Sequence, residues 1–463
     1  MQQKGRFTMM AAALVLCGMG TAYAMIPGVL GPDFQFTAKT GHISTPEGGS
    51  LLIWGYANGD GPAQYSGPTM IVNEGDIVTV ELTNALDRPT SIVFPGQGDV
   101  VAELVSGGMD TGPLTVEANP GATVRYTWEA THPGTYHYHS GTQPDLQIEM
   151  GLVGAIIVRP EGFDPVTDKR AYGHPDSAYD EEFLFLLTEM DPIIHFLVEL
   201  GYADQVDTSS FFPVYWFING RCAPDTMFPA GVDWLPNQPY NCMPMIQPGE
   251  RMLMRIIGGG RDAHPFHHHG NHARLIAEDG RLLSSTVGTG ADLAQDLFTQ
   301  PTVPGKTRDA IFTWTGEKLG WDIYGHQQDI DNPPTGDFPG PGDVDHDQDG
   351  DFDSVPLELD EYEPDHGKPF PVQLPDNMDL AFGGMWSGSP FLGAMGALPP
   401  GEGGMNPWAG FTYMWHSHTE KEMVNNDVFP GGMMTMLIVV PPRGDMDMAI
   451  PLEPGQNPIN TER

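Results

Sequence analysis

The sequence is poor in basic residues, in cysteine and in long apolar runs. It has 21 Lys and Arg against 61 Asp and Glu, which gives a formal net charge of −40 at pH 7. A chain this acidic is repelled by nucleic acid and by anionic membrane surfaces, and it attracts cations. We therefore expect no nucleic-acid partner.

One apolar run lies close to the N-terminus, between Met9 and Met19. Lys4 and Arg6 precede it, and Ala22-Tyr23-Ala24 follows. This pattern predicts a secretory signal peptide over residues 1–24, cleaved near Ala24. The run is too short to span a bilayer, so we expect no membrane span. The mature protein is expected to be periplasmic or secreted, with a net charge of −42 after Lys4 and Arg6 are removed.

Only three cysteines are present, and Cys17 lies within the predicted signal peptide. In an oxidising compartment, the remaining Cys222 and Cys242 predict a disulfide bond. Closing such a loop stabilises a protein by roughly 3 kcal/mol in the loop-entropy model. A thiolate ligand for copper is the alternative, but neither cysteine lies beside a histidine.

Short β-branched or alternating segments recur along the chain, separated by Gly, Pro and Asn turns. Examples are 76–82, 123–128, 152–158 and 251–257. They predict an all-β protein of sandwich or barrel type. The length of 463 residues favours two domains. We place them at residues 25–160 and 181–442, joined by an acidic linker at 161–180 and followed by a C-terminal tail at 443–463.

A Pro-, Gly- and Asp-rich insertion is predicted at about 320–408 in the second domain. It contains acidic side chains at alternate positions, with Gly350 at the sixth position of the pattern, as in a calcium-binding loop. Pro356 takes the twelfth position, where Glu is usual, although Glu358 is close. The alternative is a solvated acidic loop. The predicted calcium ligands are Asp345, Asp347, Asp349, Asp351 and Asp353.

The chain is rich in paired histidines. Residues 264–272 hold five histidines, and in an extended strand His267 and His269 share one face while His268 points to the other. Two further pairs are His137 with His139 and His416 with His418. Each lies next to an apolar β-like run, and residues 151–158 and 433–440 form a weak repeat after these two pairs. Imidazole is a preferred copper ligand, so we interpret the three pairs as one metal centre.

These motifs resemble the multicopper oxidase family. Residues 264–270 are similar to its H-P-x-H-x-H-G motif, residues 415–418 to its H-C-H motif, and residues 136–140 to its first-domain H-x-H motif. The resemblance implies two cupredoxin-like Greek-key domains, as in two-domain laccases and copper nitrite reductases. Those relatives are homotrimers with copper sites at subunit interfaces, which makes a homotrimer the expected assembly.

The chain departs from the family at several ligand positions. Val93 and Pro95 stand where the resemblance implies histidines, and Ser417 stands where it implies the cysteine of the blue type 1 copper. Serine does not replace a soft sulfur ligand. Glu422 stands at the second type 1 histidine, so that only His264 and Met433 are left of that site. We therefore expect a degenerate type 1 site without blue copper.

Six histidines remain as the predicted copper ligands. By resemblance, His139, His269 and His416 hold one type 3 copper, His137 and His418 hold part of the other, and His267 is left of the type 2 site. His264 is a possible additional copper ligand. Methionines 252, 254, 434 and 436 lie in predicted strands, where packing explains them better than copper binding does.

The first functional hypothesis is an exported copper oxidoreductase. A small molecule or a donor protein would supply electrons directly to the centre, where O2 or another small oxidant would be reduced. The sequence identifies no catalytic residue; Glu149, Glu420 and Glu422 are proton-donor candidates, with solvated surface acids as the alternative. The other hypotheses are a non-catalytic copper-binding protein for sequestration, and a structural envelope protein on the same scaffold.

Overall fold

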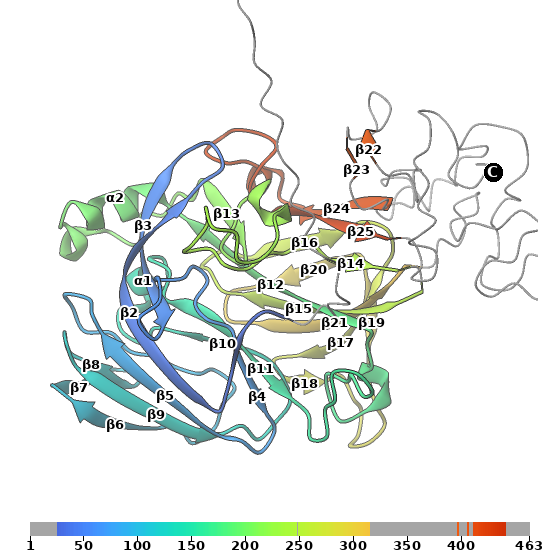
Figure 1. The fold of residues 1–463 in the computed structure, drawn as a ribbon, viewed down its shortest axis with the longest axis horizontal. Helices are drawn as coiled ribbons and strands as arrows, with labels where there is room; N and C mark the ends of the chain where they lie inside the picture. Colours follow the sequence, from blue (N-terminus) through green and yellow to red (C-terminus); the bar gives the residue numbers. More distant parts are fainter. Residues whose placement is uncertain (1–25, 248, 315–395, 398–404, 407–410, 441–463) are drawn as a thin grey trace, which may run out of the picture.

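The computed structural model describes residues 26–247, 249–314, 396–397, 405–406 and 411–440 (Figure 1). The predicted signal peptide, the calcium loop at Asp345–Asp353 and the C-terminal tail at 443–463 lie outside these residues, as does most of the insertion. No helix within the described ranges has the length and apolar character needed to cross a membrane.

The first half of the chain folds into two facing sheets. The larger has the order β3-β2-β5-β9-β6, and the smaller has the order β1-β4-β11-β10. The strands are β1 (Val29–Leu30), β2 (Asp33–Ser44), β3 (Ser50–Asn58), β4 (Met70–Asn73), β5 (Ile77–Asn84), β6 (Val101–Ser106), β9 (Thr123–Glu129), β10 (Gly134–His139) and β11 (Val153–Arg159), with a separate hairpin of β7 (Met109–Thr111) and β8 (Val116–Ala118).

The second half repeats this arrangement. One sheet has the order β13-β12-β15-β21-β17-β18, with β19 paired to β17, and the other has the order β14-β25-β24-β16-β20. The strands are β12 (Glu181–Met190), β13 (Tyr215–Ile218), β14 (Met245–Ile246), β15 (Arg251–Gly258), β16 (His264–His268), β17 (Ala273–Glu278), β18 (Arg281–Leu282), β19 (Gln295–Leu297), β20 (Thr299–Thr302), β21 (Thr307–Thr313), β24 (Phe411–Ser417) and β25 (Met434–Val439), and β22 (Gly396–Ala397) pairs with β23 (Met405–Asn406).

Helical segments are short and lie between strands. They are α1 (Pro144–Gln147), α2 (Pro192–Glu199), η1 (Pro175–Ser177), η2 (Ala203–Gln205), η3 (Asp225–Met227) and η5 (Glu420–Met423). The prediction of an all-β protein built from two cupredoxin-like sandwiches is confirmed.

The burial pattern of the strands follows their sequence patterns. β5 alternates between buried and more exposed residues, as expected for a strand with one face on a core. β11 is buried along its whole length. Its Ile156 and Val158 pack in the core of the first sandwich, whereas Val153, Ala155 and Ile157 pack in a second cluster with Leu184, Leu186 and Phe217. That second cluster is a shared core between the two halves.

The predicted linker packs tightly against the second sandwich. Ala171, Tyr172 and Tyr179 are buried together with Leu253 and Ile276. Apolar burial of this kind removes the freedom that an acidic linker would otherwise have. The segment therefore fixes, rather than loosens, the position of β12 after β11.

A buried ionic network crosses from the first half to the second. Glu182 on β12 forms ion pairs with Arg159 at the end of β11 and with Arg255 on β15. Arg255 Nη1 also donates to Thr135 Oγ1 on β10 at 2.9 Å. Thr135 in turn donates to Asp309 Oδ1 on β21 at 2.5 Å. Every member of this network is buried.

The predicted disulfide between Cys222 and Cys242 is wrong, because both are free, buried cysteines. Cys222 packs in the shared core with Ile257, while Cys242 packs in the core of the second sandwich. The Cys242 thiol lies against the backbone carbonyl oxygens of Ile218 and Thr226, at 3.6 and 3.5 Å. Burial raises the pKa of both thiols, so they remain protonated at neutral pH.

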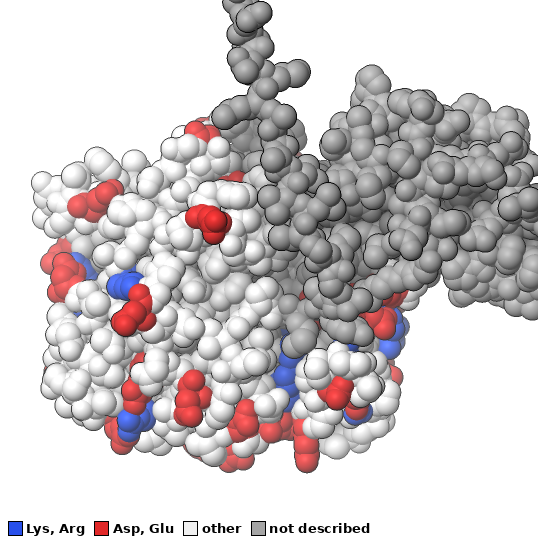
Figure 2. Space-filling model, viewed as in Figure 1, with Lys and Arg blue, Asp and Glu red and all other residues white. Residues whose placement is uncertain are grey.

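The described surface carries mostly acidic charge. Figure 2 shows red carboxylates spread over this face, with a few blue basic groups beside some of them. This agrees with the excess of 61 acidic over 21 basic residues in the sequence. Carboxylates spread in this way keep a protein soluble and raise the local concentration of cations.

We expect the E182Q variant to be less stable by about 3–5 kcal/mol at pH 7, because it leaves two buried guanidinium groups poorly paired. Burial raises the pKa of Glu182, but Arg159 and Arg255 outweigh this and lower it to about 2. The carboxylate is therefore stabilising above its unfolded pKa of about 4.3, and this stabilisation is lost as the pH falls towards 2.

Urea unfolding of wild type and E182Q between pH 7 and the lowest pH at which both fold measures this difference. The gap in unfolding free energy should narrow below about pH 4.3. E103Q is the control, since exposed Glu103 pairs with Arg125 at the surface and such pairs contribute little. A gap that does not change with pH would show that Glu182 has the same pKa in the folded and unfolded protein, which would contradict its stabilisation by Arg159 and Arg255.

Candidate metal centre

The centre is built on two neighbouring antiparallel strands of the second sandwich, β16 and β24. Their register places His267 directly opposite His416 and Phe266 opposite Ser417. The backbone N–H of His418 donates to the carbonyl of Pro265 at 2.8 Å, which extends the pairing beyond β24. Strand pairing therefore brings the second and third histidine pairs together without any bound group.

Strand alternation separates the ligands from the core, as predicted. Phe266 and His268 point inwards, where His268 contacts Phe312 and Trp415. His267 and His269 lie on the opposite face, with ring centroids 4.8 Å apart. The indole N–H of Trp415 donates to the carbonyl oxygen of His269 at 3.0 Å and so fixes the end of the strand.

Four imidazoles form a compact cluster, consisting of His267, His269, His416 and His418. Ring centroids of His267 lie 5.5 Å from His416 and 4.9 Å from His418. The Nε2 atoms of His269 and His416 are 3.2 Å apart, as expected for two nitrogens each about 2.0 Å from one ion at a near-tetrahedral angle. Ligand atoms of His267, His269 and His416 all lie within 4.8 Å of one another, so this donor set fits a metal ion.

Hydrogen bonds fix which ring nitrogen faces the centre. His416 Nδ1 lies 2.7 Å from the carbonyl oxygen of Ser417, so a neutral ring carries its proton on Nδ1 and leaves the Nε2 lone pair free. His139 has the same contact with the carbonyl of Ser140 at 2.9 Å. His267 Nδ1 lies 2.9 Å from Thr299 Oγ1 on β20. Such partners orient metal ligands and raise their basicity.

Burial and mutual repulsion keep the histidines neutral. Burial, followed by the charges of His416 and His418, lowers the pKa of His267 to about 4. Burial and the neighbouring histidines lower the pKa of His269 to about 3. The pKa of His416 is also lowered, mainly by burial. Neutral imidazole is the form that binds metal, so these side chains are ready to bind at neutral pH without losing a proton.

The first histidine pair lies on β10 of the other sandwich. The His137 and His139 rings are stacked with centroids 5.3 Å apart. Burial and His139 lower the pKa of His137 to about 3. Val93 exchanges two backbone hydrogen bonds with His139, at 2.8 and 3.2 Å. Val93 therefore lies next to the pair, where the family resemblance implies a further ligand that this chain lacks.

The structure does not bring the two groups of histidines together. In the part of the chain that it describes, ring contacts join His267, His269, His416 and His418 to one another and His137 to His139, but none links the two groups. One chain thus holds two partial ligand sets on two separate sandwiches.

His264 does not belong to the cluster. Its Nε2 lies 2.8 Å from Glu189 Oε2, and its Nδ1 lies 2.9 Å from Glu422 Oε2. Both ring nitrogens are therefore occupied by carboxylates, and all three side chains are buried. This corrects the expectation of His264 as a reserve ligand. Burial lowers its pKa, but the two carboxylates outweigh burial and raise it to about 9.

The three candidate proton donors have different environments. Glu149 and Glu422 are buried, which corrects the reading of them as surface acids, whereas Glu420 is exposed and lies 3.7 Å from His418 Nδ1. Sequence reasoning missed Glu189 and Thr299, which contact His264 and His267. A carboxylate at the end of the apolar run 183–188 was the available signal for Glu189, because buried charges are usually paired.

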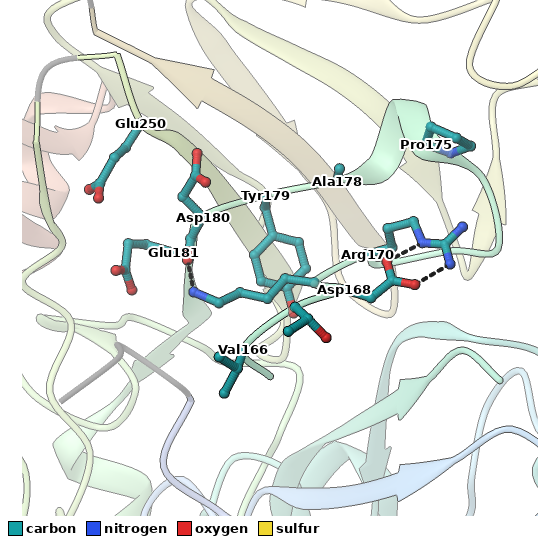
Figure 3. A pocket seen from close by; sticks show the side chains of 11 residues that line it. Val166, Asp168, Arg170, Pro175, Ala178, Tyr179, Asp180, Glu181 and Glu250 are labelled. Atoms are coloured by element: carbon teal, nitrogen blue, oxygen red, sulfur yellow. Dashed lines mark hydrogen bonds and ion pairs between the residues drawn. The ribbon is translucent and has the colours of Figure 1, made fainter. Parts of the chain in front are cut away.

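A separate cavity of about 570 Å³ lies beside the segment 166–181 (Figure 3). Arg170 pairs with Asp168, and Lys169 donates to the carbonyl of Asp180. Asp180 Oδ2 accepts from the backbone of Arg251. These polar groups are engaged within the protein, and none of the histidines described above lines the cavity.

Two histidine-bearing β-sandwiches with a clustered imidazole site resemble the multicopper oxidases. Residues 44–162 match the family model described as "Multicopper oxidase". Over these residues the chain is therefore similar to the multicopper oxidases.

Curated relatives agree with this assignment. The iron transport multicopper oxidase of Saccharomyces cerevisiae is 29% identical over 45% of this chain and 29% of its own length. An L-ascorbate oxidase of Cucumis sativus is 28% identical over 50% of this chain and 39% of its own length. A copper-containing nitrite reductase of Neisseria meningitidis is 34% identical over 28% of this chain and 30% of its own length. The chain thus spans less than half the length of each of these relatives.

Solved structures share the fold over most of the chain. A blue copper oxidase from Nitrosomonas europaea superposes with a TM-score of 0.50 at 17% identity, covering 88% of this chain and 85% of its own. The multicopper oxidase mgLAC superposes with a TM-score of 0.51 at 16% identity, covering 91% and 87%. At this identity the likeness describes the fold alone.

We expect the H416A variant to lose copper affinity by more than about 100-fold, because it removes a ligand rather than an orienting partner of one. Isothermal titration of the metal-free protein with Cu(II) measures the change. H132A is the matched control, since His132 is an exposed histidine outside the cluster. Equal binding by wild type and H416A would exclude this cluster as the copper site.

Proposed function

We propose that the chain is an exported copper oxidoreductase that works without a blue type 1 copper. The observation that carries this proposal is the cluster of four imidazoles, His267, His269, His416 and His418, on paired strands of a multicopper oxidase fold. Copper held there would supply one-electron redox chemistry towards O2 or another small oxidant. The acidic, exported character of the sequence supports a role outside the cytoplasm.

The protein's own groups have definable tasks in this proposal. His267, His269 and His416 would bind the ion, while the Ser417 carbonyl holds the His416 ring in the binding tautomer and Thr299 orients the His267 ring. Glu420 is the acid beside His418 that solvent can reach, so it is the proposed proton donor. Electrons would arrive directly from a small molecule or a donor protein.

The proposed absence of blue copper rests on the groups around His264. Ser417 is buried and offers no thiolate, and both nitrogens of His264 face carboxylates. A type 1 copper needs a thiolate and two imidazoles in a trigonal arrangement. Glu189 and Glu422 lie on opposite sides of one ring, so the three groups cannot bind a single ion together.

The test is to express the mature chain, load it with Cu(II), and record metal content, optical and EPR spectra, and O2 uptake with added reductants. We expect copper without the intense visible band of a thiolate ligand, and reductant-dependent O2 uptake that H416A abolishes. An intense thiolate band would overturn the proposed absence of type 1 copper. Retained copper without turnover on any electron donor or oxidant would favour the sequestration function instead.

We further propose that the full centre forms between copies of the chain in a homotrimer. The supporting observation is the separation of His137 and His139 on β10 from the cluster on β16 and β24. A heterologous contact that closes into a ring would place the pair of one copy against the cluster of the next.

Mixing two inactive variants tests this arrangement. H137A/H139A and H416A chains are unfolded and refolded together, and the copper content and O2 uptake are compared with those of each variant refolded alone. A centre shared between copies is expected to regain part of its activity, because some contacts then join an intact pair to an intact cluster. Absence of recovery, or a monomeric wild type in light scattering, would contradict a centre shared between copies.

A further inference from the structure

We propose that Glu189, His264 and Glu422 form a metal-free clamp that holds η5 against β12 and β16, and so positions His416 and His418 for metal binding. The inference deepens the proposed copper function and rests on it. These three residues are positioning residues rather than ligands.

The three side chains come from three separate elements. Glu189 lies near the end of β12, His264 begins β16, and Glu422 lies in η5, the turn that directly follows β24. The two contacts with His264, at 2.8 and 2.9 Å, join residues separated by 75 and 158 positions in the chain. One imidazole thereby ties three elements together at a single point.

The carboxylate of Glu189 is itself fixed. Its Oε1 accepts the backbone N–H of Asp262 at 2.9 Å and that of Arg261, while Oε2 faces His264. The backbone at Gly260 lies so close to this carboxylate that a Cβ on Gly260 would be 2.1 Å from Glu189 Oε2. Glu189 is therefore a rigid anchor for the start of β16.

The other end of the clamp controls the turn after the third histidine pair. The backbone N–H of Met433 donates to the carbonyl of Glu422 at 2.8 Å, and that of Ser417 donates to the carbonyl of Met433 at 3.0 Å. Glu422 is thus connected to Ser417, which lies between His416 and His418. If Glu422 shifts, these hydrogen bonds carry the shift to the two ligands.

Buried ions make this clamp stronger than a surface contact. The side chains of Glu189 and His264 are fully buried, and that of Glu422 is 7% exposed. Removing one partner leaves a buried charge without compensation, which strongly destabilises the surrounding structure. The clamp therefore joins to two carboxylates an imidazole that the resemblance implies as a copper ligand, and it holds the turn without an ion.

The test compares E422A, E422Q and wild type, with E149A as the matched control. Glu149 is also a buried carboxylate facing a histidine, His195, but it does not contact η5. We expect E422A to bind Cu(II) about 10- to 100-fold more weakly, as when an orienting group of a metal ligand is lost, and to show an altered copper EPR spectrum. E422Q keeps an oxygen beside His264 Nδ1 and should recover most of the affinity and the spectrum. E149A should unfold more easily but keep the wild-type spectrum.

Hydrogen–deuterium exchange of the metal-free proteins separates the clamp from the copper function. E422A should increase exchange in residues 416–424, whereas E149A should not. If the wild type binds no copper here, the proposed function fails. The exchange measurement would still test whether the clamp holds η5 in place. Unchanged exchange in E422A would overturn the clamp, and so would wild-type copper affinity and spectrum in E422A.

Discussion

The arrangement of the two sandwiches depends on a carboxylate shared between two buried guanidinium groups. Glu182 joins Arg159 and Arg255, and Arg255 continues the network to Thr135. Isolated charges could not remain at this depth, so the elements that carry them must stay together. Since Thr135 and His137 share β10, the network also sets where the first histidine pair stands relative to the second sandwich.

The sequence was sufficient for the features that depend on local pattern. Strand alternation predicted the separate faces of His267 and His268, and the histidine pairs of β16 and β24 lie together as expected, whereas the pair on β10 does not join them. It was insufficient where partners are distant in the chain. Glu189 meets His264 across 75 residues, and no local pattern reports that contact. The disulfide prediction failed for the same reason, because Cys222 and Cys242 pack in different cores.

The ionisable groups of the second sandwich are divided into two opposite environments. Around His267 and His269, burial and neighbouring imidazoles lower the pKa values to about 4 and 3, which favours neutral rings. Three residues before His267, two carboxylates raise the pKa of His264 to about 9. β16 and the residue after it thus carry neutral imidazoles of the candidate metal centre, while β16 begins with an ion-paired imidazole. Local charge, rather than residue type, distinguishes a ligand from a clamp.

This division is compatible with a candidate centre on β16 and β24 that has serine, and no thiolate, at position 417. A buried imidazole whose ring nitrogens had no partner would be costly. Glu422, which stands where the resemblance implies the second type 1 histidine, satisfies both nitrogens of His264 together with Glu189. The neighbouring ligands then keep their backbone support from Met433 and Ser417. The proposed centre has no thiolate at position 417 to carry electrons, so we propose that they arrive directly at the imidazole cluster.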